Sequence, residues 1–496
     1  MCIRDRDGLG PDAVLCAAER PAWEFAVLAA SKLWVTLAVI DAMDIHLAAA
    51  VGAVHQAGQG MGLAPAVRYS DDFENFTLCQ SMDACFRVFN VAPIILVNVL
   101  DPSKASHTTE NEEEDCAVSD GSVAYGKQFV LLDTIVVKNA DAPLVAGSDY
   151  VATHAEDGTV TITILSEAAK EAETLKVSST SLKPDGVTQA DIVGGVDALT
   201  GKETGLELVR QIYPRFGMTA GILLAPGWSH NPTVAAALQA KTEAINGNFD
   251  CVTYLDISTD KEEGGADVYT DVKTAKEALG ATSPHAAALW PMGAVGDKIY
   301  YLSAMFAALT AYTDASNSDV PYESPSNKDL KITKTVLKDG TEVLLDQQQA
   351  NDLLNANGVI TAINANGYKA WGNNTAAYPS TSDPKDRWLA VRRFFDWDGN
   401  NFILTYFQKV DKPGNTRLIQ SIVDSQNIIG NGYVARDYCA GYRTEFRSDE
   451  NPITNLLDGH LTVHTYLAPY IPAEYIENIR EYDTEALEAA LTGGGE

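Results

Sequence analysis

The chain contains 496 residues, and 46% of them are hydrophobic, which is enough to bury the cores of roughly two to four domains. Its 67 acidic and 36 basic residues give a formal net charge of −31, so the chain repels nucleic-acid backbones and anionic membranes. The composition excludes a largely disordered chain, and we expect no nucleic-acid partner.

Residues 1–64 form a segment whose assignment stays open. The segment is rich in Ala and Val, and its first letters, M-C-I-R-D-R, are typical of translated metagenomic reads and not of a signal peptide. We expect part of it to be mistranslated or shifted in frame; the alternative is a lineage-specific helical N-terminus. Lys32, Asp41 and Asp44 interrupt its apolar stretch, so we expect no membrane insertion.

Residues 65–118 predict the start of an α/β core. Residues 78–89 have the pattern of an amphipathic helix. Residues 92–100 are a continuous aliphatic run, which is typical of a strand buried on both faces of a parallel sheet. The acidic run at 110–115 predicts a solvated loop at a domain boundary, with a metal site as the alternative.

Residues 119–185 predict a small β-domain that is inserted into this core. Short alternating segments read as strands, and Asp157-Gly158 is a hairpin turn signal. The expected strands lie at 129–137, 147–151, 159–164 and 175–178.

Residues 186–362 predict the continuation of the α/β core, because strand-like and helix-like segments alternate. Such alternation favours a mostly parallel sheet with helices on its faces. The expected strands lie at 222–227, 251–257 and 285–290, and the expected helices at 206–213, 233–246, 268–279 and 298–312.

Residues 363–496 predict an α+β C-terminal domain. Segments 387–395 and 401–407 precede a helix at 417–430, which we expect to end at Gly430. Residues 461–466 alternate as a strand does, and a second β-compatible segment follows at 476–482. Pro469 and Pro472 separate the two segments, and proline cannot donate to a ladder, so the chain should leave its own sheet there.

Three stretches carry a resemblance to a known family. They read G-Y-K-A-W-G-N-N-T from residue 367, D-R-W-L-A-V-R-R-F-F-D-W from residue 386, and F-R-S-D-E-N-P-I-T-N-L-L-D-G-H-L-T-V-H-T-Y-L-A-P-Y-I-P-A-E-Y-I-E-N-I from residue 446. In this order and spacing they resemble the C-terminal half of contractile tail sheath proteins of bacteriophages and related injection devices. The segment L-L-A-P-G-W-S from residue 223 extends the resemblance into the core. In total, the resemblance covers about residues 66–490.

The resemblance implies a subtilisin-like, mostly parallel α/β core at 65–118 and 186–362, an inserted β-domain at 119–185, and a C-terminal sheath domain at 363–496. It implies a structural subunit, assembled in the bacterial host cytoplasm and located in the virion tail. Such subunits stack in helical rings by strand exchange around an inner tail tube, with baseplate and tail terminator proteins as further partners. Residues 462–466 and 475–482 are the candidate exchange segments, and Trp371 and Trp388 should be at least half buried in the tube-proximal domain.

Two other function classes are the alternatives: an α/β hydrolase-like enzyme with an inserted β-domain, and a monomeric surface-binding protein. A serine triad needs separate Asp, His and Ser residues with an oxyanion donor. Ser229 and His230 are adjacent and do not normally act on one another, so we expect no enzyme and no catalytic residue.

Cofactor and metal motifs are also missing from the sequence. The glycine pairs at 194–195 and 293–296 do not form a phosphate loop. His460 and His464 read as strand residues, and the seven cysteines show no CxxC, so we expect no cofactor and no metal. We expect Arg392 and Arg393 to pair with acidic residues of the core or of a neighbour, with tryptophans packed beside them.

Overall fold

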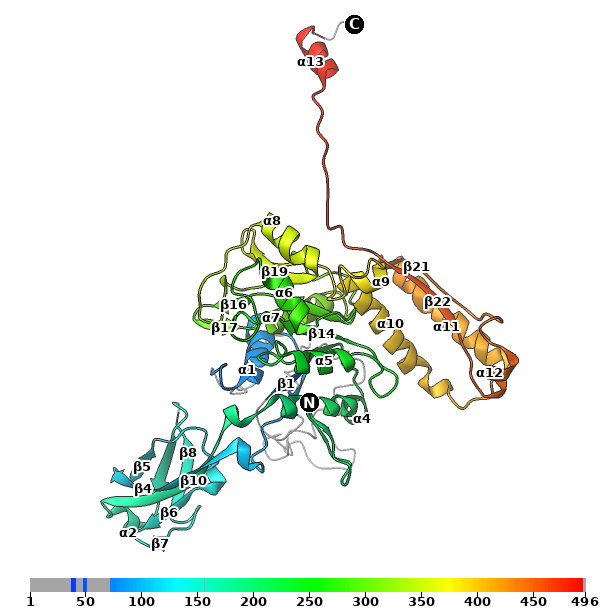
Figure 1. Cartoon of the computed structure of the whole chain (residues 1–496). Helices are drawn as coiled ribbons and strands as arrows, with labels where there is room; N and C mark the ends of the chain where they lie inside the picture. The colour runs from blue at the N-terminus through cyan, green and yellow to red at the C-terminus, as the bar shows by residue number, and fades with distance from the viewer. Residues whose placement is uncertain (1–36, 42–47, 51–71, 156, 494–496) are drawn as a thin grey trace, which may run out of the picture.

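The computed structural model describes residues 37–41, 48–50, 72–155 and 157–493. Expectations that fall on residues 1–36, 42–47 and 51–71 lie outside this part. Three bodies stand apart in Figure 1: a central layered body, a β module on one side, and a helical part that carries a hairpin and a long C-terminal arm. The content is mixed α/β, as predicted.

An eight-stranded sheet forms the centre, in the order β2-β3-β1-β13-β14-β15-β19-β20. Within this sheet every pair from β3 to β19 is parallel, and the edge strands β2 and β20 pair antiparallel with their neighbours. The strands are β1 (Leu37–Asp41), β2 (Ala48–Ala50), β3 (Ile94–Asn98), β13 (Ile222–Leu224), β14 (Val252–Asp256), β15 (Ala286–Leu289), β19 (Val359–Asn364) and β20 (Tyr368–Trp371).

Both faces of the central sheet are buried, which explains its continuous apolar runs. On β3, Ile95 and Val97 join one apolar cluster, while Ile94 and Leu96 join the cluster on the opposite face. Successive side chains of a strand point to opposite faces, so one aliphatic run fills both clusters. Helices α5 (Pro232–Ala240) and α6 (Val272–Leu279) cover the first face, and α1 (Thr77–Met82) and α7 (Leu302–Ser316) cover the second.

A separate seven-stranded antiparallel sheet makes up the β module, residues 108–182, with its own apolar core. Its strand order is β7-β6-β10-β4-β5-β9-β8. The strands are β4 (Thr108–Ser119), β5 (Ser122–Tyr125), β6 (Val136–Asn139), β7 (Ala142–Pro143), β8 (Tyr150–His154), β9 (Val160–Ile164) and β10 (Thr174–Leu182). The first and last residues, Thr108 and Leu182, are paired across the ladder, so the module leaves and rejoins the central body at one point.

The acidic run at 110–115 is not a loop, as the sequence suggested, but the middle of β4. It pairs along β10, and nearby lysines offset its charge. Glu113 lies 2.5 Å from Lys138 and 3.3 Å from Lys176, and Glu114 lies 3.2 Å from Lys127. Pairing with neighbouring strands overrides the weak strand preference of glutamate. The expected boundary between residues 118 and 119 therefore falls at the end of a strand.

Further elements differ from the sequence interpretation. Of the expected strand at 129–137, only residues 136–137 lie in a strand, β6, because residues 132–134 form a short helical turn. The expected helix at 298–312 begins later, because Lys298–Tyr300 forms β17 and the helix α7 starts at Leu302. Segments 387–395 and 401–407 belong to one helix, α10 (Leu389–Tyr406), with α9 (Pro384–Arg387) before it. The expected boundary at 362/363 falls inside β19, and β20 returns the chain to the central sheet.

Gly430 does not end its helix. Helix α11 runs from Thr416 to Ala435 and passes through both Gly430 and Gly432. A Cβ atom at Gly430 would lie 2.0 Å from the Tyr442 ring, whereas a Cβ at Gly432 would meet nothing within 4 Å. Gly430 is therefore required by the close approach of Tyr442 and not by a turn.

Replacement of Gly430 by alanine is expected to destabilise the subunit by about 1–3 kcal/mol, because the new methyl group has to displace the Tyr442 ring. Gly432→Ala is the matched control. It should raise stability by up to about 1 kcal/mol, since alanine is the better helix former. Thermal unfolding of the two purified variants measures the difference; equal midpoints would show that the ring moves at no cost.

Candidate assembly site

A two-stranded hairpin forms the C-terminal β structure of the described chain. Its strands are β21 (Cys439–Glu445) and β22 (His464–Pro469), which pair antiparallel with a bulge after Cys439. No third strand pairs with either of them within the described residues. The predicted strand at 461–466 is thus present but begins and ends three residues later.

Helix α11 fixes β21 from its outer side. The side-chain amide of Asn427 donates to the carbonyl of Thr444 at 2.8 Å and accepts from the Thr444 N–H at 2.9 Å. These bonds point the backbone polar groups of Thr444 away from β22, so Thr444 and Thr465 form a non-hydrogen-bonded pair of the ladder. By the same register, the backbone N–H and C=O groups of Thr465 point to the open edge of β22.

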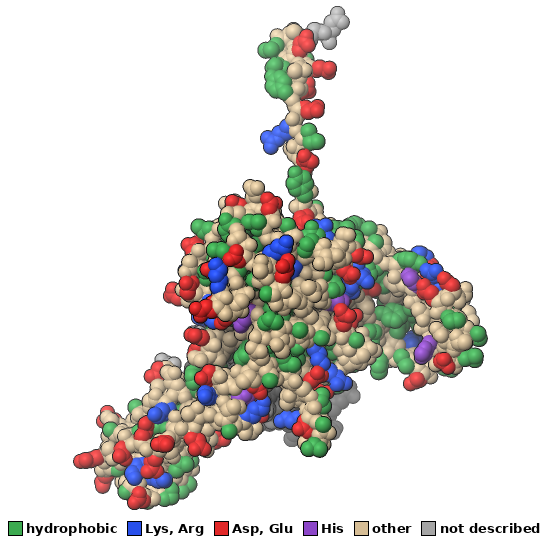
Figure 2. All heavy atoms as spheres, viewed as in Figure 1, with side chains coloured by type: hydrophobic (Ala, Val, Ile, Leu, Met, Phe, Trp, Pro, Cys, Tyr) green, Lys and Arg blue, Asp and Glu red, His purple; other side chains and the backbone are tan. Residues whose placement is uncertain are grey.

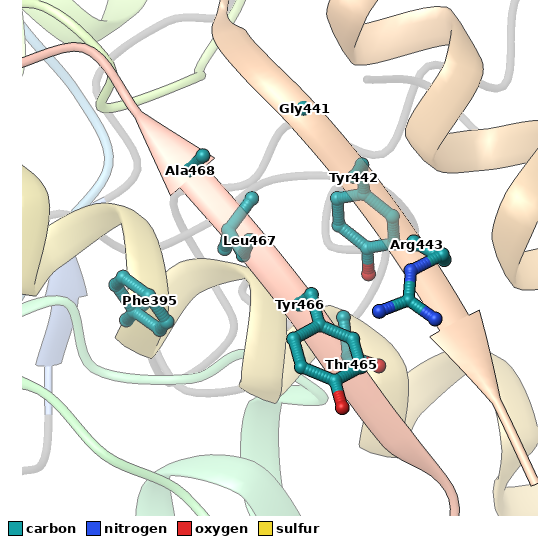
Figure 3. Close-up of a pocket in the computed structure, with 8 residues that line it drawn as sticks. All are labelled: Phe395, Gly441, Tyr442, Arg443, Thr465, Tyr466, Leu467 and Ala468. Atoms are coloured by element: carbon teal, nitrogen blue, oxygen red, sulfur yellow. The ribbon is translucent and has the colours of Figure 1, made fainter.

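A groove of about 580 Å³ lies along β22 and reaches helix α10 (Figure 3). It shares Phe395, Thr465 and Leu467 with a second, smaller groove of about 230 Å³. The helical wall of the smaller groove includes Phe395, Asp398 and Phe402, and its strand wall includes Val463, Thr465 and Leu467. The helical residues are spaced three and four apart and share one face of α10. The strand residues alternate, so they share the face of β22 that looks toward α10.

Asp398 is a buried carboxylate at the floor of this groove. Its side chain is 8% exposed, and both carboxylate oxygens accept from the Tyr442 hydroxyl, at 3.0 and 3.1 Å. Gln426 of α11 donates to the same hydroxyl at 2.5 Å. Burial raises the pKa of Asp398 to about 6, because the charged form loses solvation; the bond from Tyr442 opposes the rise. Within the described residues, no Lys, Arg or His forms an ion pair with it.

The C-terminal arm, residues 470–493, leaves the hairpin at Pro469 and extends away from the body (Figure 1). Glu474 ties its root to α9 through a 3.1 Å contact with Arg387, whose guanidinium stacks on Trp388 at 4.0 Å. Residues 473–493 are exposed, including the short helix α13 (Thr484–Leu491). Large apolar side chains on the arm therefore face solvent (Figure 2): Tyr475, Ile476, Ile479, Tyr482, Leu487 and Leu491.

Helix α10 also joins the hairpin to the central body. Arg393 forms a bidentate pair with Asp314 of α7, and both side chains are almost fully buried. His285, before β15, lies 3.3 Å from Asp396. Arg392 binds Asp396 at 2.8 Å. The expectation that both arginines pair with acidic groups is confirmed, and the partners belong to the same chain.

Ser229 and His230, the two residues considered for a serine triad, have separate partners in the structure. Its hydroxyl is buried and donates to the Asp256 carboxylate at 3.1 Å, while the backbone N–H of Asp256 donates to it at 3.0 Å. His230 lies instead near Glu263, at 3.6 Å. Ser229 is therefore bound into the end of β14, and its sequence neighbour His230 is not placed to take its proton.

The remaining sequence candidates have structural roles. His464 bonds to Glu450 at 2.9 Å and stacks near Tyr466, and His460 lies before the strand. Trp388 is 7% exposed, and Trp371 is partly buried and bonds to Asn351. In the described part of the chain, no group of three or more His, Cys, Asp or Glu residues has metal-binding geometry. The free cysteines there are all buried.

The groove and its carboxylate were not predicted from the sequence. Asp398 reads as one more polar residue on a helix, and only the contact with Tyr442, which lies 44 residues later, shows that it is buried. The available signal was the spacing of Phe395, Asp398 and Phe402 on one helical face. The described residues include no helix with the length and apolar character that a membrane crossing needs.

No family model matches the chain, but it is similar in sequence to tail sheath proteins of phages. It is 26% identical over 460 residues to the tail sheath protein of Burkholderia phage BcepMu, which covers 90% of this chain and 93% of the relative. It is 22% identical over 327 residues to the major tail sheath protein of Serratia phage KSP20, covering 65% and 78%. Among solved structures, the contracted PVC sheath complex of an extracellular contractile injection system aligns at 20% identity, with a TM-score of 0.45 over 57% of this chain and 76% of that one.

Proposed function

We infer that this chain, a homologue of tail sheath proteins, is a structural subunit of a contractile tail sheath. Such a sheath polymerises around an inner tail tube and contracts to drive the tube through a target cell envelope. The observation that carries the proposal is the match to a phage tail sheath protein along nine tenths of both chains. The predicted family and function are thus the same as those of the sequence relatives, and the proposed location is the virion tail after assembly in the host cytoplasm.

The proposed partners are further copies of this chain in stacked helical rings, the inner tube, and the baseplate and tail terminator proteins. The hairpin supports the self-association, because β22 has an open edge and residues 475–482 are an exposed, β-compatible segment. An extended segment that adds to an open edge gains backbone hydrogen bonds, each worth about 1 kcal/mol net. Such a joint holds neighbouring subunits together while they rotate.

We further propose that the central sheet and its two helical layers are the subtilisin-like core of the family, serving here as a scaffold with no catalytic role. The parallel pairing from β3 to β19 supports that comparison. Peptide cleavage by the purified chain that is lost in Ser229→Ala would favour the hydrolase alternative.

Electron microscopy of the purified chain at high concentration tests the proposed function. Hollow cylinders built of stacked rings are expected. A chain that stays monomeric at every concentration, in conditions where it is folded, would favour the surface-binding alternative.

The β module is proposed to lie on the outer surface of the sheath, where it makes no contact that assembly needs. It projects from the central body in Figure 1 and has its own core. Because Thr108 and Leu182 are ladder partners, residues 108–182 can be replaced by two glycines without moving the flanking chain. The deletion variant is expected to fold and to form cylinders that are thinner in electron micrographs. A folded variant that forms no cylinders would place the module in an interface.

A further inference from the structure

We propose that the β module is held at one fixed angle to the central body by two contacts at its root: the ring of Phe129 against Phe76, and the buried imidazole of His107 between two segments of the central body. The module then turns with the central body as one rigid piece. This inference concerns the single subunit and goes beyond the proposed sheath function, so neither depends on the other.

Phe129 brings an aromatic ring of the module into the central body. It lies in the segment between β5 and β6, and its ring meets that of Phe76 edge to face, with centroids 4.9 Å apart and planes at 83°. Phe76, at the start of α1, is 2% exposed and belongs to the apolar cluster on one face of the central sheet. The next residue, Val130, is buried in the module's own core. Two neighbouring side chains thus join two separate cores.

The backbone of Phe129 is strained in a way that this contact explains. Its φ is 56°, in the left-handed region, and it is the only aromatic residue with a positive φ in the part of the chain that the structure describes. A bulky side chain is rarely found there, and such a conformation persists only where its surroundings fix it. Those surroundings are the ring contact with Phe76 and the Phe129 carbonyl, which accepts from the N–H of Leu182 at 2.8 Å. Leu182 is the last residue of β10, so the strained residue lies at the root of the module.

His107 forms the second contact, directly before β4. Its side chain is 0% exposed, and Nδ1 accepts from the backbone N–H of Asp101 at 2.9 Å. The proton of the neutral ring therefore lies on Nε2, which is 3.4 Å from the carboxylate of Asp191 in α3 (Gln189–Val193). Asp101 precedes the module in the chain and Asp191 follows it. One imidazole thus connects the segments by which the chain enters and leaves the module.

The two segments are also in direct contact with each other. The N–H of Lys183 donates to the carbonyl of His107 at 2.8 Å. A Cβ atom at Gly186 would lie 1.8 Å from the carbonyl oxygen of Ser106, so the two backbones touch there. Phe129 and His107 bind different elements of the central body, α1 in one case and α3 with the loop after β3 in the other. The module therefore cannot turn about one contact without breaking the other.

Distances between spin labels test the fixed angle. Nitroxides on Thr274→Cys, exposed on α6, and on Glu171→Cys, exposed beside α2 (Glu167–Lys170) at the far end of the module, report how the two bodies are placed (Figure 1). All chains carry Cys2→Ser and Cys16→Ser, since the five free cysteines that the structure describes are buried. The full-length subunit is measured below its assembly concentration. A single narrow distance distribution is expected.

Two variants remove one contact each. Phe129→Gly removes the ring and lets the backbone adopt its left-handed conformation without strain, so the module keeps its own fold. His107→Leu keeps a buried side chain of similar size but has no nitrogen to bind Asp101 or Asp191. Each should at least double the width of the distance distribution, and the double variant should broaden it further. If either variant leaves the width unchanged, that contact does not fix the angle, and the proposal, which needs both, is overturned.

Leu132→Ala is the matched control. Leu132 lies three residues after Phe129 and is a partly buried apolar side chain packed against the module's own core. Its truncation should lower the thermal stability of the module without broadening the distance distribution. Broadening equal to that of Phe129→Gly would show that any weakening of the module moves it, which overturns the assigned contacts.

Amide hydrogen exchange followed by mass spectrometry identifies where the variants act. In Phe129→Gly, peptides that cover residues 99–107 and 182–187 should exchange at least tenfold faster, because the hydrogen bonds at the root open. Peptides from β9, inside the module, should keep their exchange rate. Equal acceleration in β9 would mean that Phe129 supports the module's own fold and not its placement, and the proposal would be overturned.

Discussion

A subunit truncated after Pro469 is expected to fold, to remain soluble and to form no cylinders. The cut leaves β22 complete, because Pro469 is its last residue and pairs with Cys439. The removed residues are exposed, and their tie to the body through Arg387 and Glu474 is partly exposed and worth at most about 1 kcal/mol. The assembly, however, loses a β-compatible segment whose backbone bonds would contribute about 1 kcal/mol each.

Truncation after Asp483 is the control for this experiment. It removes α13 and the last residues but keeps the segment at 475–482, so it should still assemble. Circular dichroism and thermal unfolding establish that both shortened chains fold, and electron microscopy with sedimentation measures assembly. Normal cylinders from the chain cut after Pro469 would show that the arm has no part in joining subunits.

The elements that could be predicted from the sequence are those whose burial shows in a local run of apolar residues. The runs at 92–100 and 251–257 are apolar on both faces, and both became strands of the central sheet, β3 and β14. The acidic run at 110–115 failed as a loop prediction, because lysines that lie far along the chain, such as Lys138 and Lys176, stabilise it as a strand. No local pattern contains that information.

The same limit applies to the candidate assembly site. The alternation around residue 464 and the two prolines predicted a strand and its end, since both are local properties. Gly430 was misread, because a glycine needed for contact with Tyr442 looks identical in sequence to one that ends a helix. Asp398 was missed for the same reason: its burial comes from packing of β21 against α10 and α11.

Among single substitutions where helix α10 contacts the central body, we expect replacement of Arg393 to lower the stability of the subunit most, because it breaks the pair with Asp314. Arg393 of α10 is 1% exposed and Asp314 of α7 is 4% exposed, and the two groups form a bidentate contact. Arg393→Met leaves the Asp314 carboxylate buried without a cation, which should destabilise the subunit by about 3–5 kcal/mol.

Two further variants separate the cost of an orphaned charge from the loss of an attraction. In Arg393→Met/Asp314→Leu both charges are absent, and most of the lost stability should return, because apolar groups of similar volume replace a buried pair at little cost. Lys328→Met breaks the exposed pair with Glu323 and should cost no more than about 1 kcal/mol. Urea unfolding followed by tryptophan fluorescence measures all three, since Trp388 and Trp397 flank Arg393 on the same chain segment. If Arg393→Met costs no more than Lys328→Met, water reaches this pair and α10 is not locked to the central body by it.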